Sequence, residues 1–272
     1  WDLPEHEEPP RDDEAVLDEF EELFGDAVRL RLRADVDVAL TLSGGVDSSC
    51  VAVAAGRGDR SVAAFTSTFL GRPEIDESGF AREVCKTLGL EHVPVAPGLR
   101  DLASEVPSEL ARQELPITGL SSFVHAAVLG AVRDYGMRVC VCGQGADELF
   151  LGYERYFAAW MAAAGGACEK VRRWWQAREH SRLGGARLLA IQGYFRLTRP
   201  RRRRYIARAR QWFCPNWVEQ ARADLLPMPS DLAELQRSEL LAEGLPLQLR
   251  LDDRTSAGLG MELRVPFLDY RL

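Results

Sequence analysis

The sequence lacks the features that would connect it to a membrane, to a metal cluster or to export. No run approaches twenty uninterrupted apolar residues, and no secretory signal is visible. Its 4 histidines are scattered and its 6 cysteines include no Cys-x-x-Cys pair, so neither residue type shows a metal-ligand spacing. The net charge of −7 disfavours nucleic acid as the main partner. These absences favour a cytoplasmic protein with reduced thiols and no membrane association.

The composition is that of a globular protein. Its 272 residues, 46% hydrophobic and 28% charged, suit one large domain or one and a half. The first residue is Trp1 rather than an initiator methionine, and Leu272 closely follows a motif-rich stretch. We therefore expect the chain to be part of a longer protein.

Strands and helices alternate along the first half of the chain. An acidic, Pro-rich leader and an amphipathic lead-in helix fill residues 1–35. Apolar runs then predict four strands, near residues 38–42, 61–66, 91–95 and 137–142. This alternation is typical of a parallel sheet covered by helices on both faces. The predicted fold is α/β, with a parallel sheet flanked by helices over 36–146 and a mainly helical part over 147–272.

The turn after the first predicted strand is the most informative segment, with the sequence Ser43-Gly44-Gly45-Val46-Asp47-Ser48. Its glycines permit backbone angles that aim free N–H groups at one point, and the following helix adds its own donors and dipole. Together these groups predict an anion cradle in which two hydroxyls grip phosphate oxygens and the carboxylate of Asp47 holds Mg²⁺. The lysine and spacing of a Walker loop are absent. An ordinary capped turn is the alternative.

A second glycine-rich turn, residues 143–145, follows the predicted strand at 137–142 and leads into Asp147 and Glu148. Parallel sheets bind ligands beyond the carboxyl ends of their strands, which is where both turns fall. Asp47 and Asp147 are therefore expected at one sheet edge, within reach of one Mg²⁺–pyrophosphate. Mg²⁺ takes one or two carboxylates plus phosphate oxygens. Helix capping alone would also account for the acidic pair.

The first turn resembles the Ser-Gly-Gly-x-Asp-Ser loop of the ATP pyrophosphatases. A third motif makes the resemblance to one family within this group more specific. It comprises residues 245–256 and 261–269, and the second of these segments contains Glu-x-Arg-Val-Pro-Phe-Leu-Asp. In order and approximate spacing, the three motifs together resemble the carboxy-terminal synthetase domain of the asparagine synthetase family. The likeness spans nearly the whole chain. It implies an adenine-nucleotide α-hydrolase, or PP-loop, fold and one ATP-pyrophosphatase synthetase domain over 36–272.

The resemblance implies a ligase that uses ATP and Mg²⁺ to adenylate a carboxylate, most directly that of aspartate, with release of pyrophosphate. Ammonia from glutamine then displaces AMP and forms the amide. Asp47 and Asp147 are implied as the Mg²⁺ ligands, with Gln144 and Asp147 at the reacting centre. The residues implied to bind ATP and pyrophosphate are Thr41, Leu42, Ser43, Gly44, Gly45, Asp47, Ser48, Ser67 and Gly143.

The chain departs from the family pattern where a proton must move. The family often has glutamate at position 144, proposed to take a proton from attacking ammonia, whereas Gln144 cannot act as a base. Ser256-Ala257-Gly258 also replaces the usual Ser-Met-Ala. We expect the glutaminase domain or subunit that supplies ammonia to be absent from this chain, and a transition-state lysine to lie downstream of it. A homodimer is a possible assembly.

Two other functions stay open. A relative that uses the same adenylation to make another amide, such as a β-lactam synthetase or a lasso-peptide macrolactam cyclase, fits Gln144 and the altered helical half. A binding protein or a tRNA-modifying pyrophosphatase would use the arginines clustered at residues 199–210. The simplest explanation of that cluster is a solvated helix face. The net charge argues against RNA, and the intact acidic pair argues against loss of activity.

Overall fold

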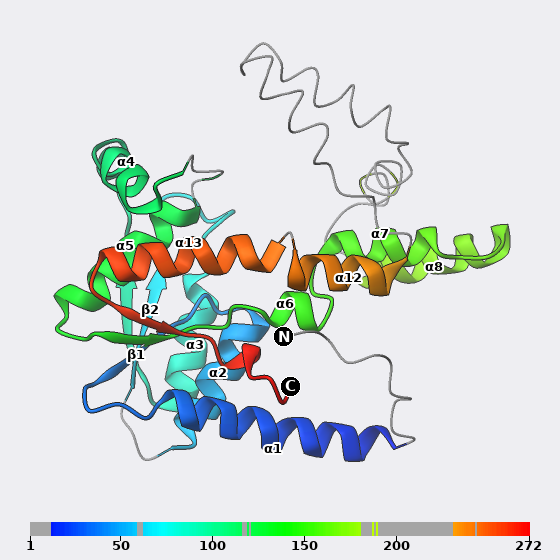
Figure 1. Ribbon diagram of the computed structural model, residues 1–272, viewed down its shortest axis with the longest axis horizontal. Helices are drawn as coiled ribbons and strands as arrows, with labels where there is room; N and C mark the ends of the chain where they lie inside the picture. Colours follow the sequence, from blue (N-terminus) through cyan, green and yellow to red (C-terminus); the bar gives the residue numbers. More distant parts are fainter. Residues whose placement is uncertain are drawn as a thin grey trace, which may run out of the picture. The chain divides into compact units, whose positions relative to one another are not determined.

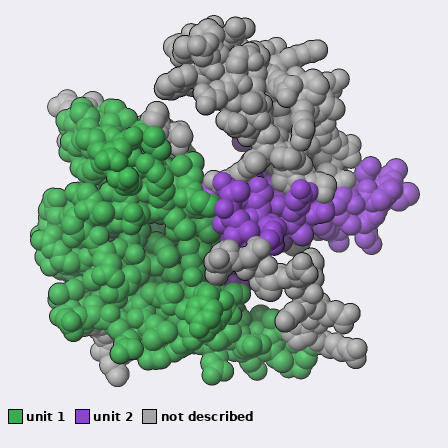
Figure 2. All heavy atoms as spheres, in the orientation of Figure 1, with its two compact units in different colours: residues 1–147, 245–272 green, residues 148–244 purple. Residues whose placement is uncertain are grey.

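The computed structural model describes residues 12–58, 62–115, 119, 121–180, 187, 189, 231–242 and 244–272. The chain forms two compact units, residues 1–147 with 245–272 and residues 148–244 (Figure 1, Figure 2). The basic cluster at residues 199–210 lies outside the described residues. No helix in the described part of the chain is long and apolar enough to cross a bilayer.

The first unit is built on a five-stranded sheet in which every pairing is parallel. The strand order is β3-β2-β1-β4-β5, so β1 lies between β2 and β4. Val38 of β1 pairs with Val62 of β2 and with Val139 of β4. The strands are β1 (Val38–Thr41), β2 (Val62–Ser67), β3 (Glu91–Val95), β4 (Val139–Val141) and β5 (Glu262–Arg264).

Helices cover both faces of this sheet. In Figure 1, α5 and α13 lie on one side of the sheet, and α1, α2 and α3 lie on the other. The short helix α6 follows β4, and a 3-10 turn, η2, follows β5. The helices of this part are α1 (Asp13–Arg31), α2 (Val46–Gly56), α3 (Ser78–Leu88), α4 (Leu99–Gln113), α5 (Ser121–Asp134), α6 (Ala146–Leu149), α13 (Gly244–Gly258) and η2 (Pro266–Leu268).

The core explains why the strand sequences are almost continuously apolar. Ala39, Phe65 and Cys140 pack against Leu129 and Val132 of α5, while the alternate strand residues face the opposite helices. Every residue of β1 except the last, and every residue of β4, is buried. Strands buried on both faces cannot show polar alternation. The predicted parallel sheet flanked by helices is confirmed.

The second unit is helical in its described part. It contains α7 (Glu154–Ala162), α8 (Ala167–His180) and α12 (Leu232–Leu241). Tyr156 of α7 packs with Leu235 of α12, and Met161 of α7 packs with Ala177 and Trp174 of α8. Each helix therefore buries one apolar stripe against its neighbour, as amphipathic helices do. The predicted helical part is confirmed.

One strand has no counterpart in the sequence predictions, which place no strand after residue 142. The structure adds β5 beside β4, with Leu263 paired to Cys140. β5 is only 3 residues long, and its Glu262 is exposed while Leu263 and Arg264 are half-buried. So short and polar an edge strand carries too little periodicity to be recognised. Through it the tail, residues 245–272, joins the same compact unit as the sheet.

Beyond β5 the tail is fastened to α1 by one buried carboxylate. Asp269 accepts hydrogen bonds from Nη1 of Arg31 at 2.5 Å and from Nε of Arg271 at 2.8 Å. Phe267 stacks on Phe24 of α1, with ring centroids 4.6 Å apart. The guanidinium groups of Arg271 and Arg31 hold the pKa of Asp269 well below its usual range.

Replacing this carboxylate, Asp269→Asn, should lower the free energy of unfolding by about 3 kcal/mol at pH 7, because two guanidinium groups lose a buried partner. The folded-state pKa lies below the unfolded value. The stabilisation is therefore complete above the unfolded pKa and is lost as pH falls toward the folded pKa. Urea unfolding at pH 7 and pH 3 should show the difference between wild type and variant narrowing in acid.

Glu262→Gln is the matched control, since Glu262 is exposed and its ion pair with Arg264 should contribute at most about 1 kcal/mol. Equal losses from the two substitutions would contradict the importance of the Asp269 contact.

Candidate active site

The turn after β1 presents the start of α2. Gly45 is the residue before the helix, with φ −69° and ψ 167°, and it supplies no side-chain cap. The first amides of α2 have no carbonyl partner within their own helix, and they carry the positive end of its dipole. Asp47 lies in this first turn and is partly exposed. The segment has the geometry of an anion site with one carboxylate at its rim.

A hydroxyl network holds the turn in shape. The side-chain oxygens of Ser43 and Ser48 lie 3.0 Å apart, and the amide of Ser43 donates to Ser48 Oγ at 3.2 Å. Ser48 Oγ donates to the carbonyl of Gly45 at 3.2 Å, and Ser49 Oγ donates to the same carbonyl at 2.7 Å. Ser48 is buried, so it shapes the turn, whereas Ser43 is exposed and available to a ligand.

Gly44 fixes the turn against α3. Its φ is +88°, a left-handed value that side chains rarely adopt. A Cβ at this position would lie 2.6 Å from the amide nitrogen of Ala81 and 2.7 Å from Cβ of Phe80. Only glycine therefore allows this close packing of the turn on the helix.

The turn after β4 packs directly on the first one. A Cβ added to Gly143 would lie 3.0 Å from the amide nitrogen of Ser48 and 3.1 Å from the carbonyl carbon of Asp47. Gly145 in the same turn has φ +96°. β1 and β4 are neighbours, and the chain leaves β1 for β2 on the other side, so the two turns meet where the strand order reverses. Such a switch point is where open parallel sheets bind ligands.

The other predicted residues lie along the same sheet edge. Thr41 ends β1, and Ser67 ends β2. The amide of Leu42 donates to the carbonyl of Phe65 at 2.9 Å, and Thr66 Oγ1 donates to the carbonyl of Leu42 at 2.7 Å. These bonds continue the pairing of β1 and β2 past the end of β1. The backbone at the ends of β1 and β2 is therefore held in place next to the turn that begins α2.

Asp47 and Asp147 are the acidic residues that the sequence predicts as metal ligands. Asp47 follows β1 and Asp147 follows β4 in α6, on two turns that touch through Gly143. No group of three or more His, Cys, Asp or Glu side chains among the described residues could hold a metal ion. Mg²⁺ needs only one or two carboxylates when phosphate oxygens and water complete its shell. The residues present fit a Mg²⁺ ion bound together with a polyphosphate.

Asp252 belongs to the third sequence motif, residues 245–256, which assigns it no role. Asp252 of α13 is buried, with His125 of α5 at 3.6 Å and a hydrogen bond from Gln248 at 3.0 Å. Burial raises the pKa of Asp252, which His125 and Gln248 partly offset. Asp252 and His125 are 127 residues apart in the sequence, so only the fold reveals the pair.

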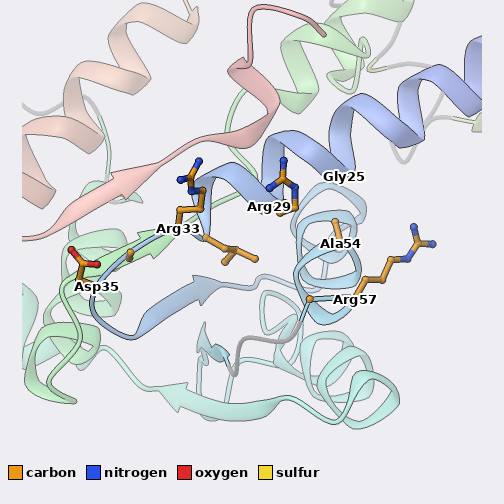
Figure 3. A pocket seen from close by; sticks show the side chains of 9 residues that line it. Gly25, Arg29, Arg33, Asp35, Ala54 and Arg57 are labelled. Atoms are coloured by element: carbon orange, nitrogen blue, oxygen red, sulfur yellow. The ribbon is translucent and has the colours of Figure 1, made fainter.

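A separate hollow of about 750 Å³ opens at the amino ends of the strands (Figure 3). Its basic residues sit near the carboxyl ends of α1 and α2, where a helix dipole favours cations. Arg29 pairs with Asp26, and Arg57 pairs with Glu21 at 2.6 Å. Two of the three arginines that line the hollow, Arg29 and Arg57, thus have acidic partners without a ligand. The hollow is lined by Gly25, Arg29, Leu32, Arg33, Ala34, Asp35, Ala54, Arg57 and Gly58.

Comparison with known proteins agrees with this geometry. Residues 19–272 match the family described as asparagine synthase. The chain belongs to the asparagine synthase family. The expected family resemblance is confirmed, and the match includes both turns and the tail that carries β5.

Several known proteins match about half of this chain. Amidase chyE of Penicillium rubens is 33% identical over 162 residues, and amidase chry2 of Gibberella zeae is 31% identical over 162 residues. Each alignment covers 54% of this chain and 24% of the relative. Asparagine synthetase [glutamine-hydrolyzing] 1 of Bacillus subtilis is 28% identical over 147 residues, covering 53% and 23%. The matched part is thus about a quarter of each of these proteins.

A solved structure, the NH3-dependent NAD synthetase of Campylobacter jejuni, overlays with a TM-score of 0.35 at 16% identity. The overlay covers 78% of this chain and 92% of that one, and it is too distant to bear on fold or function.

The contact at Gly143 leads to a direct prediction. In Gly143→Ala, the new methyl group meets backbone atoms of Asp47 and Ser48, which cannot move as a flexible side chain could. The two turns must separate, so ATP binding measured by calorimetry should weaken at least about tenfold, equivalent to about 1.4 kcal/mol. Gly130→Ala on α5 is the control, because its Cβ would meet nothing within 4 Å. Unchanged binding in Gly143→Ala would contradict a site formed by both turns.

Proposed function

We propose that this chain carries an ATP-dependent amide synthetase domain, residues 36–272, that adenylates a carboxylate and then forms an amide. The observation that carries the proposal is the contact of the two glycine turns at the switch point of the sheet. This contact supports an anion cradle that lies beside the carboxylates of Asp47 and Asp147 at one edge. An enzyme that expels pyrophosphate from ATP needs these groups together, because negative charge must be held and neutralised as it departs.

The chain's own groups have distinct roles in this proposal. The first amides of α2 and the exposed hydroxyl of Ser43 bind the leaving pyrophosphate. The backbone next to Leu42 and Ser67 receives the adenine without requiring any particular side chain. Asp47 and Asp147 hold Mg²⁺, which when bound neutralises charge on the phosphates. Catalysis then depends on position and electrostatics rather than on a covalent intermediate with the protein.

We propose aspartate as the first acceptor to test and ammonia released from glutamine as the nitrogen source. The support is family membership, together with a relative named for a glutamine-hydrolysing asparagine synthetase. A glutaminase domain or subunit would then work with this chain, in the cytoplasm where ATP and glutamine are available. The described cysteines are all free thiols, which suits that compartment.

A second candidate is an amide- or lactam-forming enzyme that acts on another carboxylate. Two relatives are named as amidases rather than as asparagine synthetases. Gln144 stands where a family base would be expected, which suits a different nitrogen nucleophile. β-Lactam synthetases and lasso-peptide cyclases are examples of this class.

One experiment separates these candidates. The full-length protein is incubated with ATP, Mg²⁺ and labelled pyrophosphate against a panel of carboxylic acids, with aspartate first. Exchange of label into ATP that depends on aspartate supports the first candidate. Exchange that requires a larger acid supports the second. Absence of acid-dependent exchange with ATP bound would reject both.

The carboxylate in the first turn of α2 allows a sharper test. Asp47→Asn should abolish Mg²⁺-dependent exchange, because a metal contact supplies several kcal/mol of charge stabilisation. The cost to folding should be only about 0.5 kcal/mol, the loss of one charge at a helix start. Asp37→Asn, an exposed carboxylate at the opposite end of β1, is the control. If Asp47→Asn retains exchange like the control, this turn does not hold the metal.

Restoring the carboxylate that the family often has at position 144 provides another test. Gln144→Glu should leave amide formation unchanged or reduce it, because it adds negative charge near the phosphates and this chain must have another proton acceptor. The measurement is the steady-state rate of amide formation from pH 6.5 to 9, with ATP binding checked separately. A clear gain of activity near neutral pH would show that the chain lacks a base elsewhere.

A further inference from the structure

The carbonyl groups at the end of α6 are held by a side chain from far along the chain. α6 has only 4 residues, and the last carbonyls of a helix have no partner within it. Nε2 of Gln236, on α12, donates hydrogen bonds to the carbonyl oxygens of Glu148 at 3.1 Å and Leu149 at 2.8 Å. All three residues belong to the second unit. One half-buried amide group therefore caps the last two residues of α6.

A second connection reaches the same helix end through the side chain of Glu148. This side chain is buried and accepts a hydrogen bond from the hydroxyl of Tyr153 at 2.7 Å. The guanidinium of Arg155 lies over the Tyr153 ring, 4.0 Å from its centroid, and donates to Glu239 of α12 at 2.8 Å. Because Glu239 follows Gln236 by three residues, the two lie on one face of α12. That face therefore supports α6 twice, once directly and once through Arg155 and Tyr153.

These contacts bear on the proposed metal site because Asp147 directly precedes Glu148 within α6. A helix this short does not keep its shape by its own hydrogen bonds. Its placement therefore depends on the β4 turn before it and on the Gln236 cap at its end. Leu151, just beyond the helix, has φ +60°, a left-handed value that non-glycine residues rarely adopt. Such a conformation persists where the surrounding contacts fix it.

We propose that α12 positions the metal carboxylate, because Gln236 directly, and Tyr153 through Glu148, hold α6 so that Asp147 meets Mg²⁺ in the orientation it requires. This inference rests on the proposed function, in which Asp147 is a Mg²⁺ ligand. Mg²⁺ demands near-ideal octahedral geometry, so a carboxylate on a loosened helix binds it poorly. Replacing a residue that orients a metal ligand typically lowers metal affinity or activity by about 10- to 100-fold.

The first test measures metal affinity in the full-length protein. Gln236→Met keeps the length of the side chain and removes its donor. Mn²⁺, which carboxylate sites bind as they bind Mg²⁺, is followed by electron paramagnetic resonance with a non-hydrolysable ATP analogue present. Its affinity should fall about tenfold. Binding of the analogue alone, measured by calorimetry in EDTA, should stay near wild type. Gln176→Met on α8 is the matched control, because Gln176 is exposed in the same unit.

A double-mutant cycle separates positioning from a general loss of stability. Asp147→Asn should itself weaken Mn²⁺ binding. Adding Gln236→Met to Asp147→Asn should then cause no further loss, because the glutamine acts through this carboxylate. A merely structural role for Gln236 would weaken Mn²⁺ binding equally in both backgrounds.

Hydrogen exchange provides a readout without metal or nucleotide. In Gln236→Met, the amides of residues 146–152 should exchange faster than in wild type, because the end of α6 opens more often. The amides of α8 should exchange as in wild type.

Three results would overturn the inference: wild-type Mn²⁺ affinity in Gln236→Met, a loss of the same size in the Asp147→Asn background, or unchanged exchange at residues 146–152. If Gln236→Met does not fold, Tyr153→Phe takes its place, since it removes the hydroxyl that holds Glu148. Weaker Mn²⁺ binding that disappears in the Asp147→Asn background then supports the inference, and unchanged binding overturns it. If Asp147→Asn binds Mn²⁺ as wild type does, Asp147 is not a ligand, and the metal site of the proposed function fails together with this inference.

Discussion

The close approach of Gly143 to the first turn of α2 is the contact on which the site depends. β1 and β4 are paired in register, and the turns after them are drawn together because residue 143 has no side chain. Gly44 secures the first turn against α3 in the same way. Backbone packed this tightly leaves little freedom, so amides and carboxylates hold their positions before a ligand arrives. Such preorganisation is the main source of electrostatic catalysis.

The two faces of the sheet carry different chemical groups. On the side of α2 and α3, the groups are amides, hydroxyls and a helix dipole, which suit phosphate. On the side of α5 and α13, they are a buried carboxylate and an imidazole, Asp252 and His125, which suit a proton or an amine. The β4 turn packs on the first of these sets, where Gly143 contacts the backbone of Asp47 and Ser48.

The sequence alone predicted those parts of the structure that are determined by residues adjacent in the chain. The turns at 43–48 and 143–147 are short segments in which glycine, hydroxyl and acidic residues follow an apolar strand, so their chemistry can be recognised without the fold. β5 could not be predicted, because Glu262, Leu263 and Arg264 are an edge strand whose polar residues reach solvent. Asp252 belongs to the third motif and His125 to none, and the two are 127 residues apart, so the sequence did not predict that they pair. Their meeting follows from the packing of α5 and α13 on one face.

Charge placement explains why a neutral residue at position 144 is compatible with the proposed phosphate site. A carboxylate in the β4 turn would lie near Asp147 and close to the phosphates, where like charges oppose binding. The neutral Gln144 removes that repulsion.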